Sequence, residues 1–63
     1  MHDFHVPDMT SSHCVTLLTR ALVRTDPACQ VIVDLARRMV RVLSSGDRAR
    51  FVTAMVGIGY RPA

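Results

Sequence analysis

The stretch CQVIVDLARRMVRVLSS, residues 29–45, decides the fold that we expect for this chain of 63 residues. Aliphatic residues recur at every second position in both of its halves: Val31, Val33 and Leu35, then Val40 and Val42. A period of two is typical of a strand with one buried face, and β-branched residues favour strands. Residues 36–38 form a short connection, so the stretch predicts a β-hairpin that ends at the turn-forming residues 44–46.

A helical pattern precedes the hairpin. In HCVTLLTRALVR, residues 13–24, apolar side chains recur at the spacing of one helix face: Val15, Leu18 and Leu22. Ser11 or Ser12 is a suitable N-cap, because a serine oxygen accepts a hydrogen bond from a free backbone N–H of the first turn. Pro27 disfavours helical backbone at the residue before it. We therefore expect this helix to end by Arg24.

A second helical pattern follows the hairpin. Its apolar residues are also at helical spacing: Phe51, Val52, Met55 and Ile58. Asp47 or Ser45 can cap its start, and Gly59 is suited to end it. Gly57 weakens the last turn, because glycine loses more conformational freedom than other residues when it becomes helical.

Two short segments complete the pattern. Residues 4–6 alternate apolar and polar side chains before a proline, which indicates a first strand, and Tyr60-Arg61 has room for a stub of a last strand. The expected order is strand, helix, strand, strand, helix, strand. In a single domain over residues 1–63, this order indicates an α+β ferredoxin-like sandwich, with two helices on one face of a four-stranded antiparallel sheet.

Composition bears on where the protein is located in the cell and on the kinds of partner that it can bind. The 8 basic residues are scattered from Arg20 to Arg61, and the net charge is +3. We interpret them as a solvated surface, with steering toward an acidic partner as the alternative. No apolar run approaches the roughly 20 residues that span a bilayer, and the N-terminus lacks the pattern of a signal peptide. We therefore expect a cytoplasmic protein without membrane insertion, in which Cys14 and Cys29 are free thiols.

Catalysis and nucleic-acid binding find little support in the sequence. No pair of carboxylates falls in a predicted cleft, and so small a domain has no room for a sizeable pocket, so we do not expect an enzyme. The adjacent His13 and Cys14 do not make the oriented set of base and nucleophile that cysteine catalysis uses. RNA-recognition modules share this topology but stack bases on aromatic residues of their central strands. The hairpin has no aromatic residue, so we expect no nucleic-acid partner.

The loop DMTSSHC, residues 8–14, gathers donors for a soft metal at the start of the first helix. The backbone N–H groups and the dipole of a helix N-terminus lower the pKa of a thiol there, which favours the metal-binding thiolate of Cys14. The imidazole of His13 suits copper and zinc. Adjacent helical residues diverge by about 100 degrees, so both can bind one ion only if His13 lies in the loop before the helix.

These segments resemble the heavy-metal-associated domain family, which includes small bacterial copper chaperones of the CopZ and Atx type and the N-terminal domains of copper-transporting ATPases. The family's motif is Met-x-Cys-x-x-Cys. Met9 and Cys14 match its methionine and its second cysteine, Ser11 stands at its first cysteine, and Gly59-Tyr60 resembles its C-terminal end. The resemblance implies a ferredoxin-like fold, Cu(I) as the metal, and a copper-transporting P-type ATPase or its metal-binding domain as the partner.

The change at Ser11 bears directly on the ligands. Two thiolates hold Cu(I) in near-linear coordination, whereas a neutral serine hydroxyl is a hard donor that adds almost nothing to Cu(I) affinity. We predict Cys14 and His13 as the metal ligands, or else a metal-bridged homodimer in which Cys14 of two chains shares the ion. By the resemblance, Met9 plugs the core beneath the loop and Tyr60 shields the site, so that Met9, Ser11 and Tyr60 surround the ion without binding it.

The sequence therefore predicts a copper chaperone or copper buffer that carries Cu(I) to a copper-transporting ATPase. Two alternatives stay open. One is a Zn(II) site built from histidines and Cys14. The other is a metal-free interaction module of the same fold.

Overall fold

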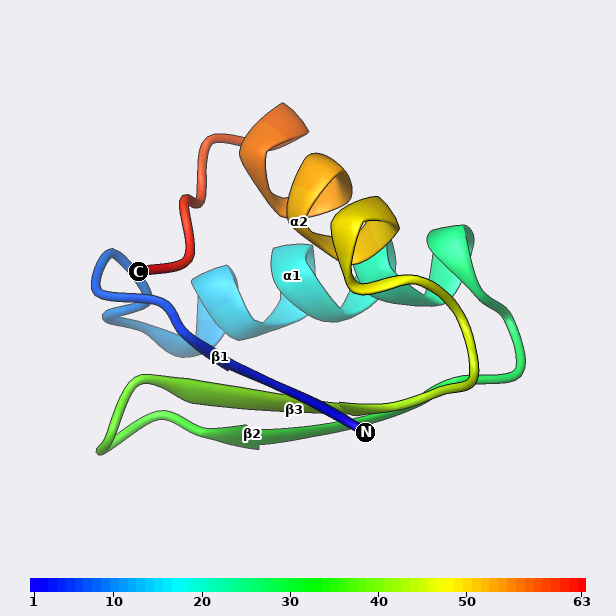
Figure 1. Ribbon diagram of the computed structural model, residues 1–63. Coiled ribbons are helices and arrows are strands. Elements are labelled where there is room, and N and C mark those ends of the chain that lie inside the picture. The colour runs from blue at the N-terminus through cyan, green and yellow to red at the C-terminus, as the bar shows by residue number, and fades with distance from the viewer.

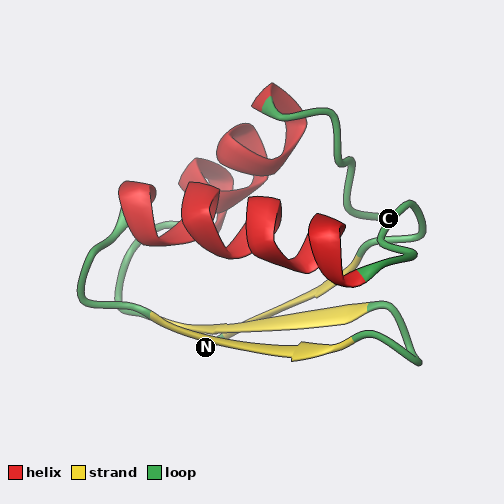
Figure 2. Cartoon of the chain, turned by 180° about the vertical axis from the view of Figure 1, so that it is seen from behind, coloured by secondary structure: helices red, strands yellow, loops and turns green.

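The computed structural model describes all 63 residues and has two layers, a sheet and a pair of helices that cover one of its faces (Figure 1, Figure 2). In chain order the elements are β1 His2–His5, α1 Ser12–Thr25, β2 Gln30–Asp34, β3 Met39–Leu43 and α2 Arg48–Gly57. The expected hairpin and both expected helices are therefore present, in the expected order.

The sheet has the strand order β1-β3-β2, and both pairings are antiparallel. The central strand β3 places Val40 opposite Phe4 of β1 and Val33 of β2. Phe4 and Val40 are fully buried against the helices, whereas their neighbours along the strands are on the uncovered face. One row across the uncovered face consists of His5, Met39 and Asp34.

The expected fourth strand at Tyr60-Arg61 is not formed, so the sheet has three strands. The N–H of Tyr60 donates to the carbonyl of Met55 at 2.9 Å and so belongs to the end of α2. Pro62 has no N–H to give to a ladder. One backbone hydrogen bond remains, from the N–H of Ala63 to the carbonyl of His5 at 2.7 Å, and a single bond does not make a strand.

Some boundaries and faces also differ from expectation. β1 begins at His2 and ends at His5, earlier than residues 4–6 suggested. Leu35 lies in the hairpin turn and is exposed, because the carboxylate of Asp34 accepts the N–H of Arg37 at 3.1 Å and starts the turn there. Ile58 is the C-cap of α2, beyond its last turn, and 40% of its surface is exposed.

The core lies between the sheet and the helices. It consists of ten buried residues: Phe4, Val6, Met9, Cys14, Leu18, Leu22, Val40, Val42, Phe51 and Met55. No buried polar or charged side chain interrupts it. Cys14 is thus both a member of the core and the donor on which the metal prediction depends.

Candidate metal site

The loop between β1 and α1 carries the candidate site and is held from two sides. The N–H of Met9 donates to the carbonyl of Val6 at 3.0 Å, and the Met9 side chain is fully buried beneath the loop. Arg38, in the hairpin turn, holds the loop from the other side. Its guanidinium donates to the carbonyl of Pro7 at 3.2 Å. Its backbone carbonyl accepts the N–H of Val6 at 2.8 Å. The expected placement of Met9 in the core is confirmed.

Ser11 starts the helix that presents Cys14. It is the N-cap of α1, with extended backbone, and its Oγ accepts the N–H of Cys14 at 3.4 Å. The same Oγ lies 3.4 Å from the Cys14 Sγ, a distance at which the hydroxyl can donate to a thiolate. Ser11 therefore serves the site as a capping and hydrogen-bonding group, a role that the comparison of metal ligands alone did not reveal.

Tyr60 reaches the same sulfur from the other end of the chain. Its Oη donates to the Cys14 Sγ at 3.0 Å. The C-terminal segment that carries it runs beside the loop between β1 and α1, as both ribbon views show (Figure 1, Figure 2). Gly59, with a φ of 90°, permits the sharp change of direction after α2 that brings Tyr60 back to the loop.

These contacts favour the thiolate form of Cys14. The hydrogen bond from Ser11, the one from Tyr60 and the backbone N–H of Thr10, in that order, lower the pKa of the thiol to about 6. Each donor stabilises the negatively charged sulfur more than the neutral thiol, which is a weak acceptor. The Cys14 hydrogen bond in turn raises the pKa of Tyr60. The lowered pKa favours the thiolate of Cys14 at neutral pH, and 9% of the surface of this residue is exposed.

His13 does not meet the condition set for chelation within one chain. It lies inside the first turn of α1, one residue before Cys14, and is exposed. Because successive helical residues diverge by about 100 degrees, its imidazole and the Cys14 thiol point in different directions. No group of three or more His, Cys, Asp or Glu side chains is close enough to hold an ion. His13 as a ligand stays a prediction.

Cys29 is separate from the site. Its Sγ donates to the carbonyl of Leu22 at 3.7 Å, near the C-terminal end of α1, and burial raises the pKa of its thiol. Both cysteines are free, as expected. None of the hollows in the surface is lined by Cys14, so the candidate site does not lie in a surface pocket.

Residues 3–61 match the family model of the heavy-metal-associated domain. The chain belongs to the heavy-metal-associated domain family. A search of curated protein sequences finds no significant match.

Solved structures with the same fold include metal-handling proteins. A gold-binding protein is 28% identical, with a TM-score of 0.91, and the alignment covers 95% of this chain and 92% of the other. The copper chaperone Atx1 from Synechocystis, in a trimeric copper form with a histidine replaced by tyrosine, is 25% identical with a TM-score of 0.96 over the whole of both chains. A protein of Agrobacterium tumefaciens is 35% identical, with a TM-score of 0.86, and covers 98% of this chain and 97% of its own.

Family and neighbours together point to a metal-binding protein of the copper-chaperone type rather than an enzyme, and support a heavy metal such as copper as the ion. Neither helix is long and apolar enough to cross a membrane.

Proposed function

We propose that this heavy-metal-associated domain is a cytoplasmic carrier or buffer of Cu(I), with Cys14 as its primary ligand. The observation that supports this most directly is the environment of the Cys14 sulfur. Hydroxyl groups lie 3.4 Å and 3.0 Å away, and they lower the pKa of the thiol to about 6. A soft thiolate at the surface is the donor that Cu(I) prefers.

A single chain offers Cu(I) one thiolate, so the second ligand comes from a molecule that faces the loop. In a metal-bridged homodimer, Cys14 of two chains supplies both sulfurs of a near-linear site. The exposed His13 of each chain then lies at the rim of the shared site, where it can complete the coordination. The gold-binding protein and the trimeric copper form of Atx1 are precedents for metal handling on this fold.

A site with one thiolate per chain is also suited to the transfer of Cu(I) to a partner protein. A copper-transporting ATPase, or its metal-binding domain, provides the missing thiolates when it docks on the loop, and Cu(I) moves by stepwise ligand exchange through a shared-metal intermediate. A site with one thiolate holds Cu(I) more weakly than a site with two and releases it more readily. Dimerisation offsets this difference as long as the second chain is bound.

The decisive experiment is a Cu(I) titration of the fully reduced protein against a chromophoric competitor, with the oligomeric state followed by size-exclusion chromatography. Cys14→Ser should abolish binding, His13→Ala should weaken it, and Cys29→Ser should leave it unchanged, because Cys29 lies away from the loop. Ser11→Cys should raise the affinity by restoring a second thiolate. Equal affinities of the Ser11→Cys variant and the native protein would contradict the one-thiolate site. No competition by the native protein would contradict the copper function as a whole.

The two alternatives give different results in the same series. A Zn(II) site of histidines and Cys14 predicts stoichiometric zinc binding that survives Cys14→Ser better than His13→Ala. Copper has the better support because the donor at the site is a soft thiolate, which Cu(I) prefers. Structural zinc takes four ligands and would also need donors from a second chain. A metal-free interaction module predicts that neither metal changes the melting temperature.

A further inference from the structure

Strand β2 leaves one edge of the sheet uncovered. It pairs with β3 alone, and none of the backbone hydrogen bonds outside the helices and ladders involves residues 30–34. The opposite edge strand, β1, has a partner outside the sheet, because the N–H of Ala63 donates to the carbonyl of His5. The outward N–H and C=O groups of β2 are therefore free to pair with another strand.

The side chains of β2 do nothing to block such pairing. Proteins usually protect an edge strand with lysine, proline, a bulge or an inward-pointing charge. The sequence QVIVD of β2 has no lysine and no proline, its one charged side chain is Asp34 at its end, and three β-branched residues fill its centre. Ile32, at the midpoint, is 54% exposed on the uncovered face of the sheet, while Val31 and Val33 are half-buried on the helix side.

The order of residues in β2 is close to a palindrome about Ile32. In antiparallel pairing of two copies centred there, Ile32 lies opposite Ile32, Val31 lies opposite Val33, and Gln30 lies opposite Asp34. Partners then always come from the same face of the sheet, so apolar residues meet apolar residues and each carboxylate meets an amide donor. A shift of two residues in either direction places Ile32 opposite Asp34 or Gln30, which removes the apolar match.

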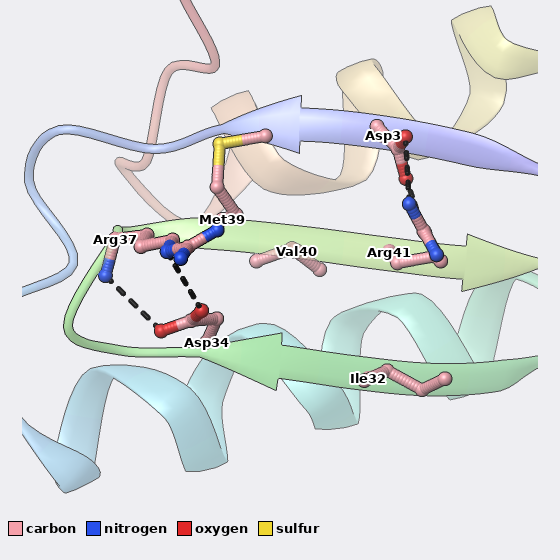
Figure 3. A pocket seen from close by; sticks show the side chains of 7 residues that line it. All are labelled: Asp3, Ile32, Asp34, Arg37, Met39, Val40 and Arg41. Carbon is pink, nitrogen blue, oxygen red and sulfur yellow. Dashed lines mark hydrogen bonds and ion pairs between the residues drawn. The ribbon is translucent and has the colours of Figure 1, made fainter.

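We propose that β2 is the interface with a second copy of this chain, paired antiparallel about Ile32 into a continuous six-stranded sheet. Figure 3 shows Ile32 on the uncovered face of β2, with Asp34 near the end of the strand, where it is bonded to Arg37. The pairing buries few residues for a protein interface, so we expect a dimer in the micromolar to millimolar range, formed at high local concentration.

This dimer differs from a metal-bridged one in its geometry. His5, Met39 and Asp34 share one row of the sheet, so the loop that follows β1 lies at the Asp34 end of β2. The antiparallel arrangement places the two loops at opposite ends of the dimer. Both Cys14 thiols stay free for metal, and each can face a partner without disturbing the interface.

The test is sedimentation velocity of the metal-free, reduced protein over a wide range of concentrations, with charge changes at Gln30. Gln30→Lys places a lysine of each chain opposite Asp34 of the other, and these two ion pairs should lower the dissociation constant of the dimer about two- to thirty-fold. Gln30→Asp places two carboxylates opposite each other and should raise the dissociation constant by a similar factor. Added salt should shrink both effects. Circular dichroism at each step establishes that the variants are folded.

A second pair of variants distinguishes pairing through the edge of β2 from association through any exposed apolar side chain. Ile32→Lys should abolish dimerisation, and Val56→Lys, at a residue of α2 that is 42% exposed, should leave it intact. Cys14→Ser should dimerise like the native protein. A native protein that stays monomeric at millimolar concentration, a dimer equally sensitive to Val56→Lys, or a dimer indifferent to the charge at Gln30 would overturn the proposal. Loss of the dimer in Cys14→Ser would overturn it as well, while leaving the copper function in place.

Discussion

The sulfur of Cys14 lies between two hydroxyl groups, one from the residue that caps its own helix and one from the far end of the chain. Tyr60→Phe keeps the ring and removes only the donor, so the pKa of the Cys14 thiol should rise from about 6 toward its usual value. The rate of alkylation as a function of pH measures this, in a Cys29→Ser background so that one thiol reacts. An unchanged profile would mean that Tyr60 does not stabilise the thiolate.

The residues of the site were predictable to different degrees. Cys14 and Tyr60 could be named from the motif and the resemblance, and the structure brings them within 3.0 Å of each other. Ser11 is one of the two N-caps that the sequence offers, and the structure confirms it as the cap. Its contact with the sulfur of Cys14 was not predicted, although the spacing of three residues between cap and cysteine could have shown it. The direction of His13 could not be predicted, because helix starts are uncertain by one or two residues and each residue turns the side chain by about 100 degrees.

The end of α2 shows how an element positions a residue of the site. The N–H of Tyr60 donates to the carbonyl of Met55, and that of Gly59 to the carbonyl of Val56, which is the Schellman pattern of hydrogen bonds. Gly59 has a φ of 90° and Gly57 does not have positive φ, yet a Cβ at either would meet nothing within 4 Å. The two glycines thus differ in backbone conformation and not in available space.

Alanine at these two positions should therefore have opposite effects on stability. Gly57→Ala should raise the free energy of unfolding by about 0.4–1 kcal/mol, because it restricts the unfolded chain at a helical position. Gly59→Ala should lower it by about 1–2 kcal/mol, because a left-handed conformation is strained for any residue with a Cβ. Urea denaturation measures both. Equal effects of the two substitutions would contradict the assigned turn.

Elements held by local patterns were predicted well, and elements that need distant partners were not. The hairpin and both helices follow from periodicity and capping residues, which act over a few positions. The fourth strand would have had to pair with β1 across the whole chain, and its candidate residues were already committed to the cap of α2 and to Pro62. The uncovered edge of β2 likewise emerges only when the strand order is known.

At the scale of the molecule, the candidate metal site and the hydrophobic core share Cys14. Cys14 is one of ten residues that form the only hydrophobic core of a 63-residue chain. A domain this small buries a modest share of its surface, so changes at one core residue affect the stability of the whole. The protonation state of Cys14 should therefore be visible in the unfolding equilibrium.

The pH dependence of unfolding follows from this coupling. In the folded chain the pKa of Cys14 is lowered to about 6, whereas an unperturbed cysteine titrates near 8.5. Between these values the unfolded state binds more protons, so the free energy of unfolding should rise with pH from about 6 to about 8.5 and then level off. Below about pH 6 the contribution should be lost, because the folded state then binds the proton too. Denaturant titrations across this range, with Cys14→Ser beside the native protein, should show the rise in the native protein alone, and a parallel rise in both would assign it to other groups.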